Sequence, residues 1–405
     1  MKLLLIADGR SPITLRWLKA IQPLGYEIHL VSTFHCPPIE KVQLVAVLPV
    51  AFASMAGSQV GRVAQPEHKT SHGLANWRPL LQKARYTLGP LTLPFFTQQF
   101  KNIVLKIKPD VVHALRIPFE GMLAAALPQG IPLLLSTWGN DLTLHARGSL
   151  LMKRLTRKAL GRADGLFSDT RRDVQLAKKW GLRAGCPTIT IPGNGGLELE
   201  EIRKMQQKPP DIPDYLHEHS PVIINPRGFR PGSVHQDIFF QCLPDVLREF
   251  PHALVICTAM EGQPEAVQQV KALGLEYNVQ LMRYVSQPEL WNLYRQSQVY
   301  VSLSSHDGTP NTLLEAMAFG CLPVCGDIES IREWITDKQN GLLVDPLDAR
   351  AAAKTLITAC RDQDLRKKAA IQNQRILHER VDVQVNRKLI KSFYQQFIKE
   401  NEWRI

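Results

Sequence analysis

Short apolar runs alternate with segments of helical periodicity along most of this 405-residue chain. Apolar runs of three to six residues predict buried strands, and in the first half these are Leu3–Ala7, Ile28–Ser32, Val42–Val47, Val111–His113, Leu133–Ser136, Gly165–Ser168 and Thr188–Ile191. A second series predicts strands at Val222–Asn225, Ala253–Thr258, Gln280–Arg283, Val299–Leu303, Leu322–Cys325 and Gly341–Val344. Predicted helices lie between them, among them Ser11–Gln22, Pro118–Leu127, Leu150–Ala159, Thr170–Trp180 and Val385–Glu400. This order predicts an α/β protein with parallel sheets that carry helices on both faces.

Two domains are expected, because the chain is longer than one hydrophobic core usually supports. Residues 203–220 are polar and rich in proline, which predicts a linker. We therefore place a first domain at 1–202, a second at 221–384, and a terminal helix at 385–405. Sheets of this kind bind ligands at the carboxyl ends of their strands.

Residues 54–100 fit the alternating pattern poorly. Trp77, Tyr86, Phe95 and Phe96 occur there among basic residues. One interpretation is a loop followed by an amphipathic helix that faces lipid or an acceptor. The other is a peripheral helix with a buried aromatic stripe, which we favour slightly.

Composition is that of a globular protein, with 44% hydrophobic and 21% charged residues. No apolar run approaches the roughly 18 residues that a membrane-spanning helix needs. The opening segment is too short for a signal-peptide core and is better explained as a strand. Seven scattered cysteines favour a reducing cytosol, so we expect a cytoplasmic protein. Cys321 and Cys325 have no partners at zinc-site spacing, so we expect buried thiols and no metal.

The net charge of +12 is confined to the first half of the chain. Residues 1–200 contain 25 Lys/Arg against 12 Asp/Glu, whereas residues 201–405 contain 24 against 25. The basic residues are densest in 147–183. This region is either a solvated helix face or a surface drawn to an anionic membrane, at its inner face. Nucleic acid is not expected as a partner, because no aromatic-interleaved basic motif occurs.

The most informative stretch is Asp307–Gly320, which follows the predicted strand Val299–Leu303. A polar loop ends at Thr309, a predicted N-cap, and Pro310 fits the first turn of a helix that Gly320 ends. Glu315 lies inside that helix, eight residues after Asp307. Between the two acids lie the backbone N–H groups of a helix N-terminus, which suit an anion such as phosphate. Two acids around an anion cradle predict a sugar-nucleotide site.

The second half resembles the retaining glycosyltransferases of family GT4. The resemblance rests on Ser304–Val324, on Gly326–Glu333 and on Asn340–Pro346. It extends, more weakly, over most of residues 1–385. It implies the GT-B fold, in which two Rossmann-like domains face each other across a cleft and the terminal helix crosses back to the first domain. It also implies a nucleoside diphosphate sugar as donor and a glycan, a lipid-linked saccharide or another small molecule as acceptor.

The diphosphate needs cations, since no Asp-x-Asp metal motif stands at a strand end in the first half. Arg227 and Arg230 directly follow the strand Val222–Asn225, and guanidinium groups grip phosphate oxygens in pairs. The family usually has a Lys five residues after its Arg, where this chain has Gly232. We therefore expect no metal cofactor, and we expect the cradle to add donor contacts from Gly308, Thr309, Pro310, Asn311 and Thr312.

The resemblance gives the two acids different roles. Glu315 would accept hydrogen bonds from the ribose hydroxyls, and Arg283 with Tyr284 would lie where the chain passes the nucleobase. Asp307 stands where the family has Glu and would face the transferred sugar. Because Asp is shorter by one methylene, this departure puts the donor sugar and the level of activity in doubt. We count Asp307 as a catalytic candidate.

The first half contributes the expected sugar or acceptor side. His113 is a second catalytic candidate, either as a sugar contact or as a structural residue at a strand end. A turn that resembles the family's loop near the sugar contains Trp138, Gly139 and Asp141, with turn capping by Asp141 as the alternative. The remaining candidates lie in turns after predicted strands: Gly9, Arg10 and Asn194.

Two other classes of function stay open. One is a GT-B-fold epimerase or phosphorylase, against which the helix motif at Asp307–Gly320 argues. The other is a catalytically weak or inactive binding or scaffold protein, which the departures at Asp307 and Leu115 favour.

Overall fold

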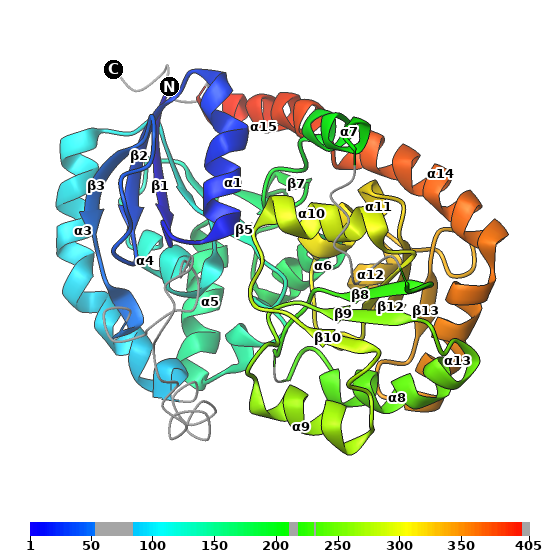
Figure 1. The fold of residues 1–405 in the computed structure, drawn as a ribbon. Coiled ribbons are helices and arrows are strands. Elements are labelled where there is room, and N and C mark those ends of the chain that lie inside the picture. The colour runs from blue at the N-terminus through cyan, green and yellow to red at the C-terminus, as the bar shows by residue number, and fades with distance from the viewer. Residues whose placement is uncertain (53–83, 210–217, 231, 399–405) are drawn as a thin grey trace. The chain divides into compact units, whose positions relative to one another are not determined.

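The computed structural model describes residues 1–52, 84–209, 218–230 and 232–398. These residues form two compact units. The first contains Met1–Gly196 together with the chain from Asn386 onward, and the second contains Leu197–Val385. Each unit is a parallel sheet with helices on both faces (Figure 1).

Seven parallel strands form the sheet of the first unit within the residues described, in the order β3-β2-β1-β4-β5-β6-β7. Their bounds are β1 Lys2–Ala7, β2 Glu27–Ser32, β3 Gln43–Val47, β4 Val111–Ala114, β5 Leu133–Thr137, β6 Gly165–Ser168 and β7 Thr188–Thr190. The α-helices are α1 Pro12–Ile21, α3 Leu93–Ile107, α4 Met122–Ala124, α5 Leu150–Arg162, α6 Arg171–Trp180 and α15 Val383–Ile398. From Asn386 on, α15 belongs to this unit.

The second unit has six described strands in the order β10-β9-β8-β11-β12-β13. Their bounds are β8 Val222–Asn225, β9 Leu254–Cys257, β10 Val279–Leu281, β11 Val299–Ser302, β12 Leu322–Gly326 and β13 Leu342–Val344. Its helices are α7 Leu199–Gln207, α8 Gln236–Glu249, α9 Pro264–Ala272, α10 Gln287–Gln296, α11 Asn311–Ala318, α12 Glu329–Arg332, α13 Ala349–Arg361 and α14 Gln363–Arg380.

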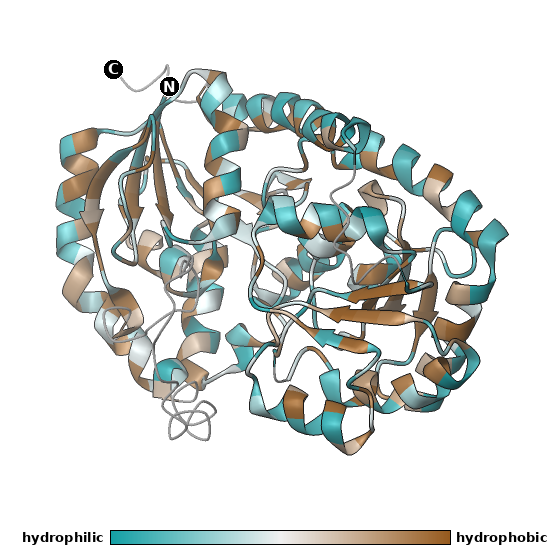
Figure 2. Cartoon of the chain, in the orientation of Figure 1, coloured by the Kyte–Doolittle hydropathy of each residue, from teal (hydrophilic) through white to brown (hydrophobic). Residues whose placement is uncertain are grey.

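Each sheet is apolar on both faces. In β1, Leu4 and Ile6 pack among residues of α3, α4 and α5, whereas Leu3 and Leu5 pack among residues of α1 and α15. The strands are therefore brown along their length in Figure 2, while the helices alternate brown and teal. Burial on both faces is what continuous apolar strands predict for parallel sheets.

The first six strands of each sheet have the same order, in which successive strands are added first on one side of the first strand and then, from the fourth strand on, on its other side. In doubly wound sheets this reversal of strand order opens a crevice at the carboxyl ends of the strands, where ligands bind. The reversal lies between β1 and β4 in the first unit and between β8 and β11 in the second. The two-domain Rossmann-like fold expected from the sequence is confirmed.

The structure differs from the sequence expectation at two segments. Residues 199–207, which include the start of the predicted linker, form α7, and Leu199 and Ile202 pack in the core of the second unit. Residues 210–217 of that linker lie outside the described residues. The predicted helix Pro118–Leu127 is reduced to α4, because Pro118 is extended and Phe119 has a positive φ of 64°.

Candidate functional site

Two loops meet at the reversal point of the second sheet. The loop after β8 carries Arg227 and Arg230, and the loop after β11 carries Asp307. An antiparallel bridge joins Val234 to Ser304, and His235 Nε2 lies 2.8 Å from Ser305 Oγ. Fold and hydrogen bonding thus bring together loops that carry candidate donor-site residues far apart in the sequence.

Buried amides fix the loop after β8. Gln236, the first residue of α8, accepts from Asn225 Nδ2 at 2.7 Å and donates to the Gly228 carbonyl at 2.7 Å. The Arg227 N–H donates to Asn225 Oδ1 at 3.2 Å. Gly228 has a φ of 59°, which favours glycine and turns the chain directly after Arg227. The Arg227 backbone is therefore held from both sides.

The Arg227 side chain is buried and points to the loop after β11. Its Nη2 donates to Asp307 Oδ2, and its Nη1 donates to Thr312 Oγ1 at 3.2 Å. Burial alone would lower the pKa of Arg227, but the Asp307 carboxylate together with nearby tyrosines and Cys325 outweighs it, and the pKa is raised. The buried Nε has no hydrogen-bond partner among the described residues. A buried N–H without an acceptor is unusual, and an anion bound here would supply one.

Arg230 adds a second positive charge at this site. The Arg227 charge lowers the pKa of Arg230 to about 10, so both guanidinium groups are charged at neutral pH. The Arg230 side chain is exposed and forms no ion pair within the described part of the chain. Two neighbouring cations with one carboxylate between them leave a net positive charge for a ligand to neutralise.

The N-terminus of α11 is open. Asn311 is its first residue, and Pro310 occupies the N-cap position, with no side chain capping the helix. This corrects the predicted capping by Thr309, whose hydroxyl instead accepts from Trp334 Nε1 at 3.0 Å. Pro310 has no N–H to donate. The N–H groups of Asn311 and Thr312 are thus left at the open end of the helix, where the helix dipole favours an anion.

Asp307 is fixed at both its backbone and its side chain. Its carbonyl accepts from Ser330 Oγ at 2.8 Å, and its Oδ1 accepts from the Gly308 N–H at 2.9 Å. The Gly308 amide, expected in the anion cradle, is therefore engaged by Asp307. The Asp307 side chain is 17% exposed and faces Arg227.

Glu315 lies buried in the second turn of α11. Its Oε1 accepts at 3.0 Å from Nε2 of Gln287, which is the first residue of α10. At the C-terminal end, Gly320 has a φ of 86°, and the Cys321 N–H donates to the Ala316 carbonyl. This Schellman ending confirms Gly320 as the stop of the helix.

Arg283 and Tyr284 follow β10 at the same edge of the second sheet. Both side chains are exposed. Arg283 donates to the Tyr284 carbonyl at 2.9 Å and to Glu289 Oε1 at 2.8 Å. The Arg283 carbonyl accepts from the Ala259 N–H at 3.1 Å. The segment is positioned by its backbone.

His113 lies in the core of the first unit. It is 0% exposed, and its Nδ1 and Nε2 lie 2.7 Å from Tyr394 Oη and 2.8 Å from Ser136 Oγ. The ring stacks on Phe167 with centroids 4.8 Å apart, and burial lowers the pKa of His113 to about 3. Both ring nitrogens are engaged by protein groups, so the structure supports the structural interpretation and not the catalytic one.

A turn after β5 holds the other sugar-side candidates. Buried Asp141 accepts from Arg116 Nε at 2.9 Å and from the Trp138 N–H at 3.2 Å, and burial raises the pKa of Asp141. Gly139 donates to Asp169 Oδ2 at 3.3 Å. Asp141 therefore acts as a turn cap as well as an ion-pair partner, as the alternative interpretation expected.

Asn194 lies in the turn after β7, close to the turn after β5 that contains Trp138. Its Oδ1 accepts from the Gly196 N–H at 3.0 Å. The preceding Gly193 packs against the Trp138 indole, since an added Cβ would lie 3.2 Å from Trp138 Cδ1. The first unit thus brings Trp138, Gly139, Asp141 and Asn194 together.

Gly9 and Arg10 form the turn after β1. The Gly9 N–H donates to Ser32 Oγ at 3.1 Å, and a Cβ on Gly9 would meet Cys36 Sγ at 2.6 Å. The space next to Gly9 is thus filled by Cys36. Arg10 pairs with Asp8 at 3.1 Å and lies over the Phe34 ring.

Sequence reasoning missed one charged group at the carboxyl edge of the first sheet. Glu120 is 7% exposed and accepts from Thr33 Oγ1 at 3.0 Å. Burial raises its pKa to about 7, against the opposing charges of Arg116 and Arg85. Its sequence neighbours Pro118 and Phe119 resembled the start of a helix, so nothing in the pattern marked Glu120.

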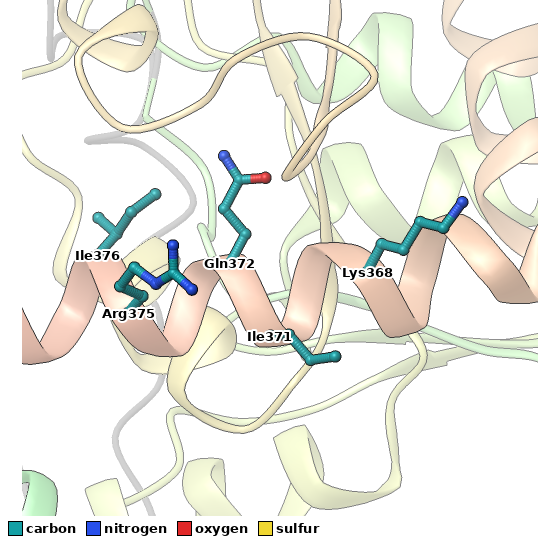
Figure 3. Close-up of a pocket in the computed structure, with 5 residues that line it drawn as sticks. All are labelled: Lys368, Ile371, Gln372, Arg375 and Ile376. Carbon is teal, nitrogen blue, oxygen red and sulfur yellow. The ribbon is translucent and has the colours of Figure 1, made fainter.

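Within the described ranges, no group of three or more His, Cys, Asp or Glu side chains is arranged to hold a metal ion. A surface pocket on α14 is lined by Lys368, Ile371, Gln372, Arg375 and Ile376 (Figure 3). It contains none of the candidate site residues, and we assign it no role.

Comparison with known families decides the classification. Residues 9–192 match the model described as glycosyl transferase 4-like domain, and residues 235–375 match the model described as glycosyl transferases group 1. Together these matches cover well over half of the chain. The chain belongs to the group 1 glycosyltransferases.

Curated relatives of this group 1 glycosyltransferase match it over a shorter stretch. A GDP-mannose:cellobiosyl-diphosphopolyprenol alpha-mannosyltransferase of Xanthomonas campestris is 33% identical over 102 residues. That stretch is 24% of this chain and 27% of the relative, so the chain spans about a quarter of the relative's length. The corresponding enzyme of Xanthomonas oryzae pv. oryzae is 32% identical over 102 residues.

Solved structures resemble the chain along its whole length. Anabaena HepE in complex with UDP and glucose has a TM-score of 0.67 at 16% identity, covering 98% of this chain and all of HepE. Sucrose-phosphate synthase of Thermosynechococcus elongatus has a TM-score of 0.70 at 14% identity, covering 99% and 100%. At these identities the likeness shows the GT-B fold that this glycosyltransferase shares with them.

Proposed function

We propose that the chain is a metal-independent, retaining glycosyltransferase that moves a sugar from a nucleoside diphosphate sugar to a lipid-linked saccharide or another glycan acceptor. One observation carries the proposal. The Arg227 and Arg230 guanidinium groups and the open N-terminus of α11 lie at the reversal point of the second sheet, with buried Glu315 in the same helix. This set of groups suits a diphosphate joined to a ribose.

Transfer breaks the bond between the anomeric carbon and a diphosphate oxygen. The acceptor oxygen bonds to that carbon and gives up its proton to the departing diphosphate, on which negative charge grows as the bond breaks. Arg227, Arg230 and the Asn311 and Thr312 N–H groups are preorganised to stabilise that charge. Because two guanidinium groups and a helix terminus supply positive charge, we infer that no metal is needed.

Asp307 is assigned to the transferred sugar. When the diphosphate binds the Arg227 guanidinium, the Asp307 carboxylate is released from its pair with Arg227. It can then accept hydrogen bonds from sugar hydroxyls and stabilise positive charge at the anomeric carbon. Retention of configuration is inferred from the resemblance to family GT4. On the first unit we assign Trp138, Gly139 and Asn194 to the acceptor side.

The names of the relatives support one class of donor and one class of acceptor. The Xanthomonas enzymes are named for GDP-mannose and a diphosphopolyprenol acceptor, and the HepE structure contains UDP and glucose. A nucleoside diphosphate is common to both, so we propose it as the donor class. The named acceptor of the curated relatives supports a lipid-linked saccharide. We place such an enzyme in the cytoplasm, peripheral at the inner face of the membrane.

A second candidate is a catalytically weak binding protein of the same fold. The Arg227–Asp307 pair favours it, because the shorter acid is held by the arginine that should grip the donor.

Incubation with UDP-, GDP- and ADP-sugars tests both candidates. An active enzyme slowly releases nucleoside diphosphate from one donor in water alone, and a retaining enzyme first frees the sugar anomer that the donor carried. Binding without release from any donor, with and without saccharide acceptors, supports the second candidate and contradicts the first.

A further inference from the structure

Exposed apolar side chains gather at the starts of two helices of the first unit. Leu88, Leu91 and Phe95 are 51%, 54% and 82% exposed, and Leu150 is 86% exposed. Residues 88, 91 and 95 are three and four positions apart along the 3-10 turn Gly89–Thr92 and α3, which places them on one helical face. The opposite face of α3 is buried through Leu93, Phe100, Val104 and Ile107.

The start of α5, where Leu150 lies, packs against Tyr86, which precedes Leu88 by two residues. Ser149, the N-cap of α5, donates to the Tyr86 carbonyl at 2.7 Å. A Cβ on Gly148 would meet the Tyr86 ring at 2.5 Å, and Tyr86 Oη lies 2.7 Å from His145 Nδ1. The starts of α5 and of the segment after Tyr86 are thus packed together.

These two helical segments carry basic side chains and no acidic ones. Residues 84–107 and 142–162 contain no Asp or Glu. Arg147, Lys153 and Arg154 are exposed, and their side chains make no hydrogen bond or ion pair to another residue that the structure describes. We call the surface made by these three cations with Leu88, Leu91, Phe95 and Leu150 the α3–α5 patch.

Large exposed apolar groups beside unpaired cations suit one kind of partner. At a bilayer surface, apolar side chains enter the boundary between headgroups and acyl chains, while Lys and Arg meet lipid phosphates. A second copy of the chain fits less well, because a two-fold interface would bring the same cations face to face. We propose that the α3–α5 patch docks the chain on an anionic lipid bilayer.

The α3–α5 patch lies at the carboxyl edge of the first sheet, the edge that carries the candidate acceptor-side residues. Helices α3 and α5 precede β4 and β6, so each begins at the carboxyl edge of the first sheet (Figure 1). Arg10 and Trp138 follow the carboxyl ends of β1 and β5 at the same edge. If the acceptor is lipid-linked, docking would hold that edge at the membrane. This consequence rests on the proposed function, whereas bilayer binding itself does not.

Co-sedimentation of the full chain with vesicles tests the inference without any sugar donor. Vesicles of phosphatidylcholine mixed with phosphatidylglycerol are compared with vesicles of phosphatidylcholine alone. One variant combines Phe95→Ser with Leu150→Ser, and a second combines Lys153→Gln with Arg154→Gln. The matched control is Ile371→Ser, because Ile371 is 70% exposed between Lys368 and Arg375 on α14 of the second unit (Figure 3).

The chain is expected to bind the anionic vesicles and to release from them in about 1 M salt, where the screening length is about 3 Å. Binding should fall about fivefold for each cation removed, and about tenfold or more in the apolar variant. Ile371→Ser should bind like the unaltered chain. No binding to anionic vesicles, equal binding by all variants, or an equal loss in Ile371→Ser would overturn the proposal. So would self-association of the unaltered chain that Phe95→Ser/Leu150→Ser abolishes, since the patch would then be an interface between copies.

Discussion

The Arg227 guanidinium donates to the Asp307 carboxylate across the reversal point of the second sheet. These residues are 80 positions apart in the sequence, and each was assigned to a different part of the donor. The acid expected to face the sugar thus neutralises the arginine expected to bind the diphosphate. A diphosphate bound at Arg227 Nη2 would compete with the Asp307 carboxylate for that group.

Removing the Asp307 charge should strengthen binding of a nucleoside diphosphate that carries no sugar. In Asp307→Asn, the phosphates no longer compete with a carboxylate for Arg227, so we expect roughly tenfold tighter binding, or about 1.4 kcal/mol. The free variant should be about 2–3 kcal/mol less stable, because a buried guanidinium loses its counter-charge. Sugar transfer should be largely lost.

Calorimetric titration and thermal melting measure both effects. The matched control is Asp327→Asn, which opens the exposed pair with Arg332. Weaker diphosphate binding in Asp307→Asn, or the same change in the control, would show that the Arg227–Asp307 pair does not compete with the ligand.

Glu315 should determine recognition of the ribose. We expect Glu315→Ala to bind a nucleoside diphosphate at least about tenfold more weakly, since hydrogen bonds to a buried charged group are worth about 1.5–3 kcal/mol. The unaltered chain should also discriminate against a dideoxynucleoside diphosphate, and the variant should not. Equal discrimination by both proteins would remove the ribose role of Glu315. Gln287→Ala, which removes only its hydrogen-bond partner, should have a smaller effect.

Arg230 should act on the phosphates and not on the nucleoside. Its exposed guanidinium is held near Arg227, and the proximity of the two charges lowers the pKa of Arg230 to about 10. Arg230→Ala should weaken nucleoside diphosphate binding about tenfold and leave nucleoside binding unchanged. Competition titrations with the two ligands separate these results, and Arg332→Ala is the surface control. A parallel loss for both ligands would mean that Arg230 only supports the loop.

Glu120 should make stability depend on pH. Burial raises its pKa to about 7, so from about pH 4.5 upward the unfolded chain loses this proton before the folded chain does. The contribution of Glu120 to stability therefore falls as pH rises to about 7 and stays level above it. Glu120→Gln should be up to about 3 kcal/mol more stable than the unaltered chain at pH 8.

The same difference should vanish near pH 4, where Glu120 is protonated in both states. Denaturant unfolding at the two pH values measures it. The neutral amide can still accept from Thr33, so loss of that hydrogen bond does not confuse the result. A stability difference that is constant with pH would place the pKa of Glu120 near its ordinary value.

Strands were predictable because burial on both faces demands continuous apolar runs. Gly165–Ser168 and Val222–Asn225 match β6 and β8 without change. The helix predicted at Pro118–Leu127 was wrong over its first residues, because the positive φ of Phe119 interrupts it and the sequence pattern does not report that φ. The first residues of the predicted linker are helical, because α7 packs Leu199 and Ile202 into the core of the second unit. The polar sequence pattern does not report this tertiary contact.

The candidate site was predictable only where strand ends position it. Arg227 and Asp307 follow neighbouring strands, so their proximity follows from the strand order. Their direct ion pair could not be predicted, because the family resemblance assigned Arg227 to the diphosphate and Asp307 to the sugar. His113 matched a motif, but its engagement by Tyr394 depends on a helix 281 residues away.

Thermal melting with UDP, GDP and ADP in a chelator tests the central claim most directly. We predict that at least one nucleoside diphosphate raises the Tm of the unaltered chain by several degrees without metal, since a ligand at 100 times its Kd adds about 2.7 kcal/mol. Arg227→Ala should lose that shift while remaining folded. If no nucleoside diphosphate or its sugar shifts the Tm, or if Arg227→Ala responds fully, the second unit does not hold the donor site described.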